Sequence, residues 1–186
     1  MSSPLADAAS PWVQRWAPLI APLGRVLDVA CGRGRHALFF AERGCTVTAV
    51  DRDATALAGL PAGLEACHAD LEAAPWPLAG RRFDAVVVTN YLWRPLWPVL
   101  LASLDDGGVL IYETFAVGQA AFGKPTNPDF LLRPGELLEV CRDLHIVAYE
   151  DGTLALPPRR VQRIVAVLAP PPGAPAPPLG LARVDG

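Results

Sequence analysis

Residues 26–37 read VLDVACGRGRHA, and this stretch decides the fold. Its apolar residues surround Asp28 and run into a turn in which Gly32 and Gly34 are followed by Ala37. The spacing fits G-x-G-x-x-G/A, the pattern of a tight turn between a buried strand and the helix that follows it. We therefore predict a strand over residues 25–30 and a helix that begins at the glycines. The carboxylate of Asp28 is out of place in an apolar strand and needs an explanation.

The composition is that of a globular protein with one domain. The chain has 186 residues, of which 52% are hydrophobic and 19% charged, and its formal net charge is −3. That length suits a single core, and the negative charge disfavours a long nucleic acid as partner. The four cysteines form no C-x-x-C pair, which argues against a metal site and against a disulfide framework.

The N-terminus lacks the basic and apolar regions of a secretory signal. Apolar runs elsewhere are short and interrupted by proline, so we expect no membrane span. We therefore expect a cytoplasmic protein with free thiols. The sequence makes no prediction about its oligomeric state.

Apolar runs and turn residues alternate along the chain in the order strand, helix, strand. Helices are expected at 11–20, 33–44, 54–60, 95–104 and 134–144, and strands at 25–30, 45–50, 64–69, 83–90, 107–115, 145–152 and 161–168. This order predicts an α/β, Rossmann-like open sheet that is mostly parallel and has helices on both faces. The last two strands are close in sequence and predict an antiparallel hairpin at the sheet edge.

The expected domain covers residues 1–169, and residues 1–24 form an N-terminal helical lid within it. Residues 170–186 are proline-rich and are expected to be a flexible tail. Residues 116–134 are too long for an ordinary connection and suit a lid over the substrate. Two cations in or near this lid, Lys124 and Arg133, would suit an anionic acceptor, although surface charge explains them about as well.

Three acidic residues, Asp28, Asp51 and Asp70, follow successive predicted strands. An ionised carboxylate only accepts hydrogen bonds, so it requires a ligand with hydroxyl, amino or cationic groups. Asp51 lies 17 residues after Gly34, close to the spacing of a group that binds a ribose diol. Asp70 could accept from an adenine amino group, with Leu71 beside the ring.

The carboxylate of Asp28 distinguishes between two cofactors. A nicotinamide dinucleotide would place its pyrophosphate at the glycine turn, where a nearby carboxylate would repel it. An amino acid moiety avoids this conflict, because its ammonium can meet Asp28 directly or through water while its carboxylate meets the turn. S-adenosylmethionine carries such a zwitterion at one end and adenosine at the other, which favours it over NAD.

Residues 26–53 resemble the first two cofactor motifs of class I S-adenosylmethionine-dependent methyltransferases, and residues 26–168 are similar in layout. The loop and the first helix resemble most the small bacterial tellurite-resistance-type methyltransferases. The family usually has glycine where Ala30 stands, and alanine is small enough for the turn. The resemblance implies methyl transfer to a small molecule, tellurite- or thiol-like or anionic. It implies cofactor contacts from Asp28, Ala30, Gly32, Gly34, Asp51, Arg52, Asp70, Leu71 and Asn90.

Catalytic candidates follow the fourth and fifth predicted strands. Tyr91 comes where this superfamily commonly places residues beside the transferred methyl. Glu113 could act as a base or pair structurally with Arg133, and Arg133 could contact the acceptor. His36, at the start of the first helix after the glycines, could touch the ligand, but packing or capping explains it better. We expect no metal, because methyl transfer does not require one.

Other functions fit the same sequence. An NAD(P)-dependent oxidoreductase could use the same sheet, but Asp28, the terminal hairpin and the absence of a Tyr-x-x-x-Lys pair speak against it. A cofactor-binding module without catalysis is a further alternative, since no acid–base pair stands out. An RNA or protein acceptor is less consistent with the negative charge.

Overall fold

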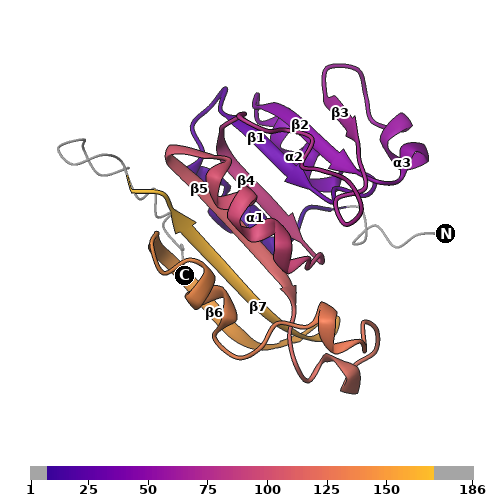
Figure 1. Cartoon of the computed structure of the whole chain (residues 1–186), viewed down its shortest axis with the longest axis vertical. Helices are drawn as coiled ribbons and strands as arrows, with labels where there is room; N and C mark the ends of the chain where they lie inside the picture. Colours follow the sequence, from indigo (N-terminus) through magenta and orange to yellow (C-terminus); the bar gives the residue numbers. More distant parts are fainter. Residues whose placement is uncertain (1–7, 170–186) are drawn as a thin grey trace.

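The computed structural model describes residues 8–169, which form a seven-stranded sheet in the order β3-β2-β1-β4-β5-β7-β6 (Figure 1). The strands are β1 Arg25–Val29, β2 Thr46–Asp51, β3 Glu65–His68, β4 Phe83–Thr89, β5 Leu104–Phe115, β6 His145–Ala155 and β7 Pro158–Val167. The first five run parallel, and β7 runs antiparallel to both of its neighbours. The predicted Rossmann-like sheet with a C-terminal hairpin is confirmed.

The strand order reverses beside β1, which pairs with β2 on one side and β4 on the other. Most residues of β1 and β4 are apolar and buried, as expected of parallel strands that are covered on both faces. Because the chain leaves β1 and β4 toward opposite sides of the sheet, a crevice opens at their carboxyl ends. Ligands of open α/β sheets bind at such a crevice.

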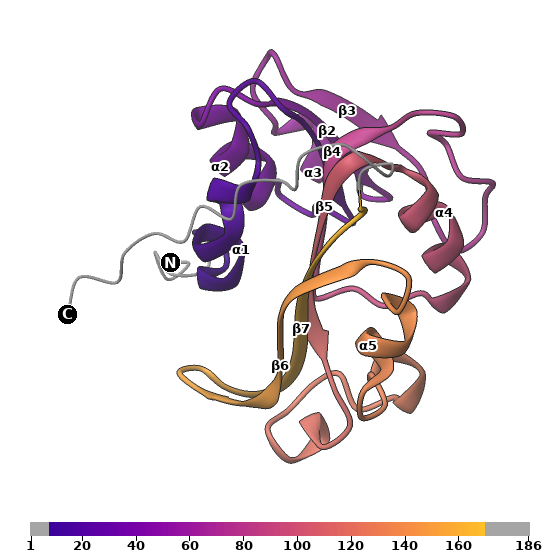
Figure 2. The same ribbon diagram turned by 90° about the vertical axis from the view of Figure 1, so that its left-hand side faces the viewer.

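Helices cover both faces of the sheet, as expected (Figure 2). α1, α2 and α3 pack on one face, where they share a core cluster, and α4 and α5 pack on the other. The α-helices are α1 Pro11–Trp16, α2 Arg35–Glu42, α3 Ala54–Ala58, α4 Trp97–Ala102 and α5 Glu136–Val140. Short 3-10 helices are η2 Ala17–Leu19, η3 Arg94–Leu96, η4 Gln119–Ala121 and η5 Pro128–Phe130.

Most elements differ in length from the expectation, and the hairpin and helix α5 are two examples. The hairpin strands are longer than predicted, because Pro158 is the first residue of β7, a position where a missing backbone N–H costs no ladder bond. Helix α5 is shorter than the predicted 134–144, since Gly135 before it takes a left-handed φ of 74° and Cys141 ends it. Neither difference changes the topology.

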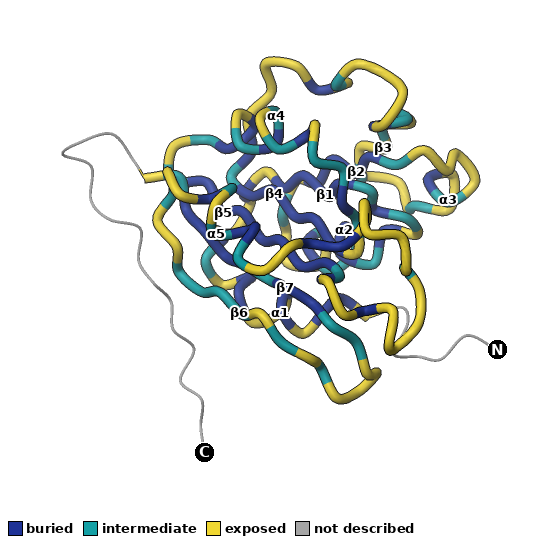
Figure 3. Tube along the Cα trace, turned by 60° about the horizontal axis from the view of Figure 1, so that its bottom comes forward, coloured by how far each residue is buried: buried dark blue, intermediate teal, exposed yellow. Residues whose placement is uncertain are grey.

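Burial is greatest along the central strands and the inner sides of α1 and α2 (Figure 3). The proposed lid role of residues 1–24 remains a prediction: in its described part, α1 packs on the sheet through Trp12, Val13 and Trp16. The expected tail at 170–186 lies outside the described residues. Within residues 8–169, no helix is both long and apolar enough to cross a bilayer.

Candidate functional site

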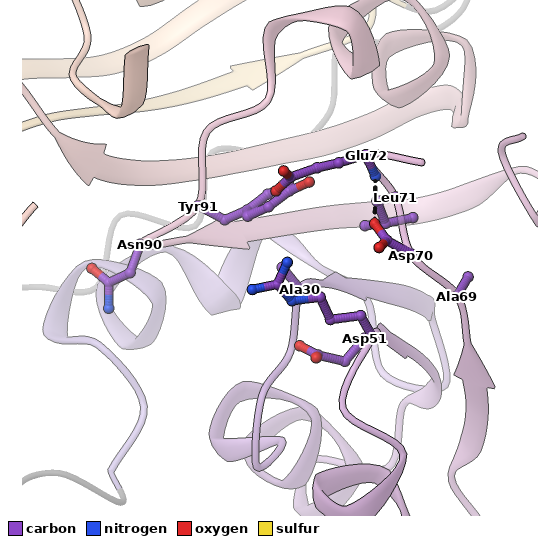
Figure 4. Close-up of a pocket in the computed structure, with 9 residues that line it drawn as sticks. Ala30, Asp51, Ala69, Asp70, Leu71, Glu72, Asn90 and Tyr91 are labelled. Atoms are coloured by element: carbon purple, nitrogen blue, oxygen red, sulfur yellow. Dashed lines mark hydrogen bonds between the residues drawn. The ribbon is translucent and has the colours of Figure 1, made fainter. Parts of the chain in front are cut away.

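Three adjoining cavities lie at the carboxyl edge of the sheet, and Asn90 lines all three. The first, which we call the acidic cleft, has about 240 Å³ and is lined by Ala30, Asp51, Arg52, Ala69, Asp70, Leu71, Glu72, Asn90 and Tyr91 (Figure 4). The aromatic cavity has about 430 Å³ and is lined by Glu72, Asn90, Tyr91, Leu92, Thr114, Phe115, Lys124, Pro125 and Phe130. The arginine cavity has about 410 Å³ and is lined by Ala30, Cys31, Gly32, Arg33, Arg35, His36, Leu38, Thr89 and Asn90.

The glycine turn between β1 and α2 has a left-handed backbone at Ala30, Gly32 and Gly34, whose φ angles are 51°, 55° and 74°. Glycine adopts this conformation freely, whereas alanine is strained by about 1 kcal/mol or more. This explains why a glycine is usual at position 30. The N–H of Gly32 donates to Asp51 Oδ2 at 2.7 Å, which fastens the turn to the end of β2.

Asp28 has a structural partner. Its Oδ2 accepts from the N–H of Ala37, the third residue of α2, at 3.0 Å, and the side chain is 1% exposed. Burial raises the pKa of Asp28 to about 7, although the bond from Ala37 opposes the shift. The carboxylate thus satisfies a free N–H at the start of α2. Asp28 lines none of the three cavities, so its contact with a cofactor remains a prediction.

The remaining acidic strand ends meet in the acidic cleft. Asp51 and Asp70 come from the ends of β2 and β3, and Leu71 lies beside them. Backbone N–H groups fix both carboxylates: Asp53 donates to Asp51 and Glu72 donates to Asp70, each at 2.9 Å. The carboxylate oxygens keep further lone pairs for a ligand. Two carboxylates that the sequence places at separate strand ends therefore line one space.

Tyr91 and Glu72 lie side by side where the acidic cleft meets the aromatic cavity (Figure 4). The Tyr91 hydroxyl is buried and has no hydrogen-bond partner within residues 8–169. Burial raises the pKa of Tyr91, and the charges of Glu72 and Asp70 raise it further, so the hydroxyl stays protonated. The sequence analysis missed Glu72, although it lies two residues beyond the strand-end acid Asp70.

Glu113 points away from the acidic cleft, and its expected pairing with Arg133 is wrong. Side chains alternate along β5, so Glu113 faces the α1 side together with Ile111. There it is 1% exposed and accepts from Ser10 Oγ at 2.9 Å, Arg163 at 3.2 Å and Arg159 at 3.4 Å. These partners occupy its carboxylate, which leaves its role as a base without geometric support.

Arg133 lies on the opposite face and binds Glu136, to which its Nη2 donates at 2.9 Å. Arg94 donates two bonds to the same carboxylate, at 2.8 and 2.9 Å. Burial alone would raise the pKa of Glu136, but the bonds from Arg94 and Arg133 outweigh it and lower the pKa to about 2. Arg133 lines none of the three cavities, so its catalytic role remains a prediction.

His36 connects the arginine cavity to the N-terminal segment. Its Nε2 accepts from the backbone N–H of Ser10 at 3.2 Å, so Nδ1 carries the proton and can donate to Thr89 Oγ1 at 3.3 Å. Burial lowers the pKa of His36 to about 3, which keeps the ring neutral. The packing interpretation of His36 therefore has direct support, although its ring also borders a cavity.

A protein family described as "Methyltransferase domain" matches residues 26–106. The match covers less than half of the chain and includes strands β1 to β4, so this part of the chain is similar to a methyltransferase domain. Every residue that lines the acidic cleft lies within the matched segment. The resemblance to class I S-adenosylmethionine-dependent methyltransferases that the sequence indicates is confirmed.

Two curated methyltransferases are similar in sequence to part of this chain. Ribosomal RNA small subunit methyltransferase J of Psychromonas ingrahamii is 30% identical over 116 residues, which are 58% of this chain and 44% of that protein. Malonyl-(acyl-carrier protein) O-methyltransferase of Enterobacter lignolyticus is 37% identical over 106 residues, which are 50% of this chain and 39% of that protein. The chain spans less than half the length of either relative.

Solved structures share the fold of the methyltransferase domain at low sequence identity. TehB from Haemophilus influenzae superposes with a TM-score of 0.69 at 19% identity, over 86% of this chain and 62% of that one. An S-adenosylmethionine-dependent methyltransferase from Mesorhizobium loti gives a TM-score of 0.66 at 17% identity, over 87% of this chain and 99% of that one. At these identities the likeness concerns the fold.

Proposed function

We propose that the protein binds S-adenosylmethionine in the acidic cleft and transfers its methyl group to a small-molecule acceptor. The observation that carries this proposal is the meeting of Asp51, Asp70 and the glycine turn around one cleft of a methyltransferase domain. The cofactor is the one that the methyltransferase comparisons indicate.

The residues of the cleft fit the parts of this cofactor. Asp51 would accept hydrogen bonds from the ribose diol, and Asp70 would accept from the adenine amino group beside Leu71. The turn after β1 and the cations Arg33 and Arg35 would hold the amino acid carboxylate, since both arginines line the cavity at this turn. Burial lowers the pKa of Arg35, and so does the nearby charge of Arg159, whereas the charges of Glu113 and Asp28 raise it.

When bound, S-adenosylmethionine supplies a methyl group on a sulfonium, and the electron pair of the breaking C–S bond stays on sulfur. The protein's part is to hold the acceptor nucleophile in line with that methyl. Such positioning can lower the activation free energy by about 7–11 kcal/mol. Tyr91 and Asn90 lie between the cavities and would position the two ligands. For a nucleophile that carries a proton, the carboxylate of Glu72 is the acceptor nearest to both cavities.

The size of the cavities supports a small acceptor. Each side cavity has slightly more than 400 Å³, within the range of about 300–1,000 Å³ for small-molecule sites. An anionic acceptor is supported by Lys124, which lines the aromatic cavity, and a tellurite- or thiol-like acceptor is the one that the sequence resemblance implies. One relative is named for ribosomal RNA, but the net charge of −3 favours a small molecule over RNA.

Replacement of Asp51 tests the cofactor site. Asp51→Ala should weaken S-adenosylmethionine binding about 10- to 100-fold, the value of one or two hydrogen bonds to a charged group. Isothermal titration calorimetry measures this, and thermal unfolding checks that the loss of the bond to Gly32 leaves the fold intact. Asp53→Ala is the matched control, because Asp53 caps α3 and does not line the cleft.

Equal affinity of the Asp51→Ala variant and the unchanged protein would place the cofactor elsewhere. Binding of NAD in place of S-adenosylmethionine would instead support an oxidoreductase. Tight cofactor binding without methyl transfer to any acceptor in a broad panel would indicate a binding module.

A further inference from the structure

The aromatic cavity joins the acidic cleft through the three residues that line both, Glu72, Asn90 and Tyr91. A molecule in the aromatic cavity would therefore border a cofactor in the cleft. The arginine cavity borders the cleft on the other side, through Ala30 and Asn90, and is lined mainly by the glycine turn and α2. The acceptor has two candidate places, and the chemistry of their walls distinguishes them.

The walls of the aromatic cavity are mostly apolar. Tyr91, Leu92 and Phe115 line it from the sheet side, and Pro125 and Phe130 line it from the segment 116–134. Phe130 is 39% exposed, a costly position for a large apolar side chain unless something covers it. Such walls favour a ring-sized apolar body, whereas a small inorganic oxyanion would leave them without contacts.

The outer wall is held in place. Arg94 donates to the backbone carbonyls of Asp129 and Leu131, at 2.7 and 3.0 Å, and these two residues flank Phe130. The same guanidinium holds the buried carboxylate of Glu136. Because backbone bonds fix the chain on both sides of Phe130, its ring forms a wall that exists before a ligand binds.

The cavity carries polar groups of both charges. Lys124 is its single cation, and it has no ion-pair partner within residues 8–169. The Glu72 carboxylate lies beside the protonated Tyr91 hydroxyl at the border with the acidic cleft, and Asn90 and Thr114 add neutral polar groups. A few placed polar groups in an apolar site fix the orientation of a ligand.

We infer that the aromatic cavity binds the methyl acceptor, and that this acceptor is an organic molecule with an apolar ring and an anionic group directed to Lys124. This inference rests on the proposed function and names the substrate class. It selects against inorganic oxyanions, which have no apolar part to fill the cavity.

A fluorescent probe of matching chemistry tests the cavity without a known substrate. 8-Anilinonaphthalene-1-sulfonate has apolar rings and an anionic sulfonate, and its emission rises in apolar surroundings. Phe130→Ala should weaken its binding about tenfold, and Lys124→Gln about fivefold with a smaller dependence on salt. Phe122→Ala is the matched control, because Phe122 is 44% exposed on the same segment and does not line the cavity.

Leu38→Ala tests the competing place, since Leu38 lines the arginine cavity and is not among the groups that would hold the cofactor. The probe affinity of this variant should equal that of the unchanged protein. A loss with Leu38→Ala and none with Phe130→Ala would overturn the inference, and equal losses with Phe130→Ala and Phe122→Ala would also overturn it.

Methyl transfer gives a second measurement. In a panel of aromatic carboxylates with phenol or thiol groups, tested beside tellurite, Phe130→Ala should raise KM for the aromatic acceptors about tenfold and leave the Kd of S-adenosylmethionine unchanged. Turnover of tellurite alone, at equal rates in both proteins, would contradict the inference and leave the proposed function standing. Absence of S-adenosylmethionine binding would contradict the proposed function, while the probe titration would still report on the cavity.

Discussion

Asp28 and His36 are buried titratable residues on either side of the glycine turn. Burial shifts the pKa of each, and the two shifts have opposite effects on the free energy of unfolding as pH falls. The pKa of Asp28 is raised to about 7, so between about pH 4 and 7 the folded protein binds a proton that the unfolded chain releases. The pKa of His36 is lowered to about 3, so between about pH 3 and 6.5 the unfolded chain binds the extra proton. As pH falls from 7 to 5, Asp28 adds stability and His36 removes it.

Replacement of His36 by glutamine should expose this opposition. Glutamine at position 36 keeps an acceptor for the Ser10 N–H but does not titrate. The loss of stability that His36 causes below pH 6.5 therefore disappears in His36→Gln. When the pH falls from 7 to 5, the free energy of unfolding should change differently in the two proteins. The change in the variant should be more favourable than that in the unchanged protein by about 2 kcal/mol. Urea denaturation of both proteins at the two pH values measures this difference, and parallel pH dependences would contradict it.

At the scale of elements, Arg94 links η3 to the segment 116–134 and to α5. Its guanidinium makes four hydrogen bonds, two to the carboxylate of Glu136 and two to backbone carbonyls. The segment holds little regular structure of its own, only η4 and η5. Backbone bonds hold the two ends of the segment together, as between the Val117 N–H and the Leu132 carbonyl at 2.9 Å, whereas Arg94 fixes the part around η5.

Replacement of Arg94 by methionine should loosen the segment without unfolding the sheet. Arg94→Met keeps much of the side-chain volume and leaves Glu136 paired with Arg133 alone, so we expect a loss of about 1–3 kcal/mol. Amide hydrogen exchange within 116–134 should become about 10- to 100-fold faster. Arg142→Met, which removes an exposed arginine paired only with Asp143, is the control. Exchange unchanged from that of the control would contradict the role of Arg94.

Elements with a strong local pattern could be predicted from the sequence, and those fixed by distant partners could not. The runs around Val26, Val47 and Val87 predicted three parallel strands, and Asp51 and Asp70, which follow the predicted strands at 45–50 and 64–69, predicted the cleft. Arg94 and Glu136 are 42 residues apart, and no local pattern connects them. Whether Glu113 acts as a base or pairs with Arg133 stayed open in the sequence, because the alternation of side chains along β5 fixes the face on which Glu113 lies only once the sheet is packed.

At the scale of the whole molecule, the N-terminal helix packs against the last strand of the sheet. The Trp12 indole N–H donates to the Ile164 carbonyl at 3.4 Å, across 152 residues of sequence. The Arg163 guanidinium lies 4.6 Å from the centroid of the Trp12 ring. Ser10 adds a bond to Glu113 in the same region. The beginning and the end of the domain are thus packed into one core.

Replacement of Trp12 by alanine should destabilise the entire domain. Trp12 is 1% exposed, and such a truncation costs about 3–5 kcal/mol. Urea unfolding followed by circular dichroism and by tryptophan fluorescence should still show coincident transitions, because α1 and β7 belong to one cooperative unit. Leu156→Ala, at the 92% exposed hairpin turn, should change stability by less than about 0.5 kcal/mol. Separate transitions for the two probes would contradict the single unit.

The two bonds at the glycine turn have a consequence for the kinetics of recognition. Asp28 holds the start of α2 through Ala37, and Asp51 holds Gly32, so carboxylates from two neighbouring strands fix the turn from both ends. The loop has already lost most of its conformational entropy during folding, and an arriving molecule has little left to order. Association would then be set by diffusion into an open crevice rather than by a slow rearrangement of the protein.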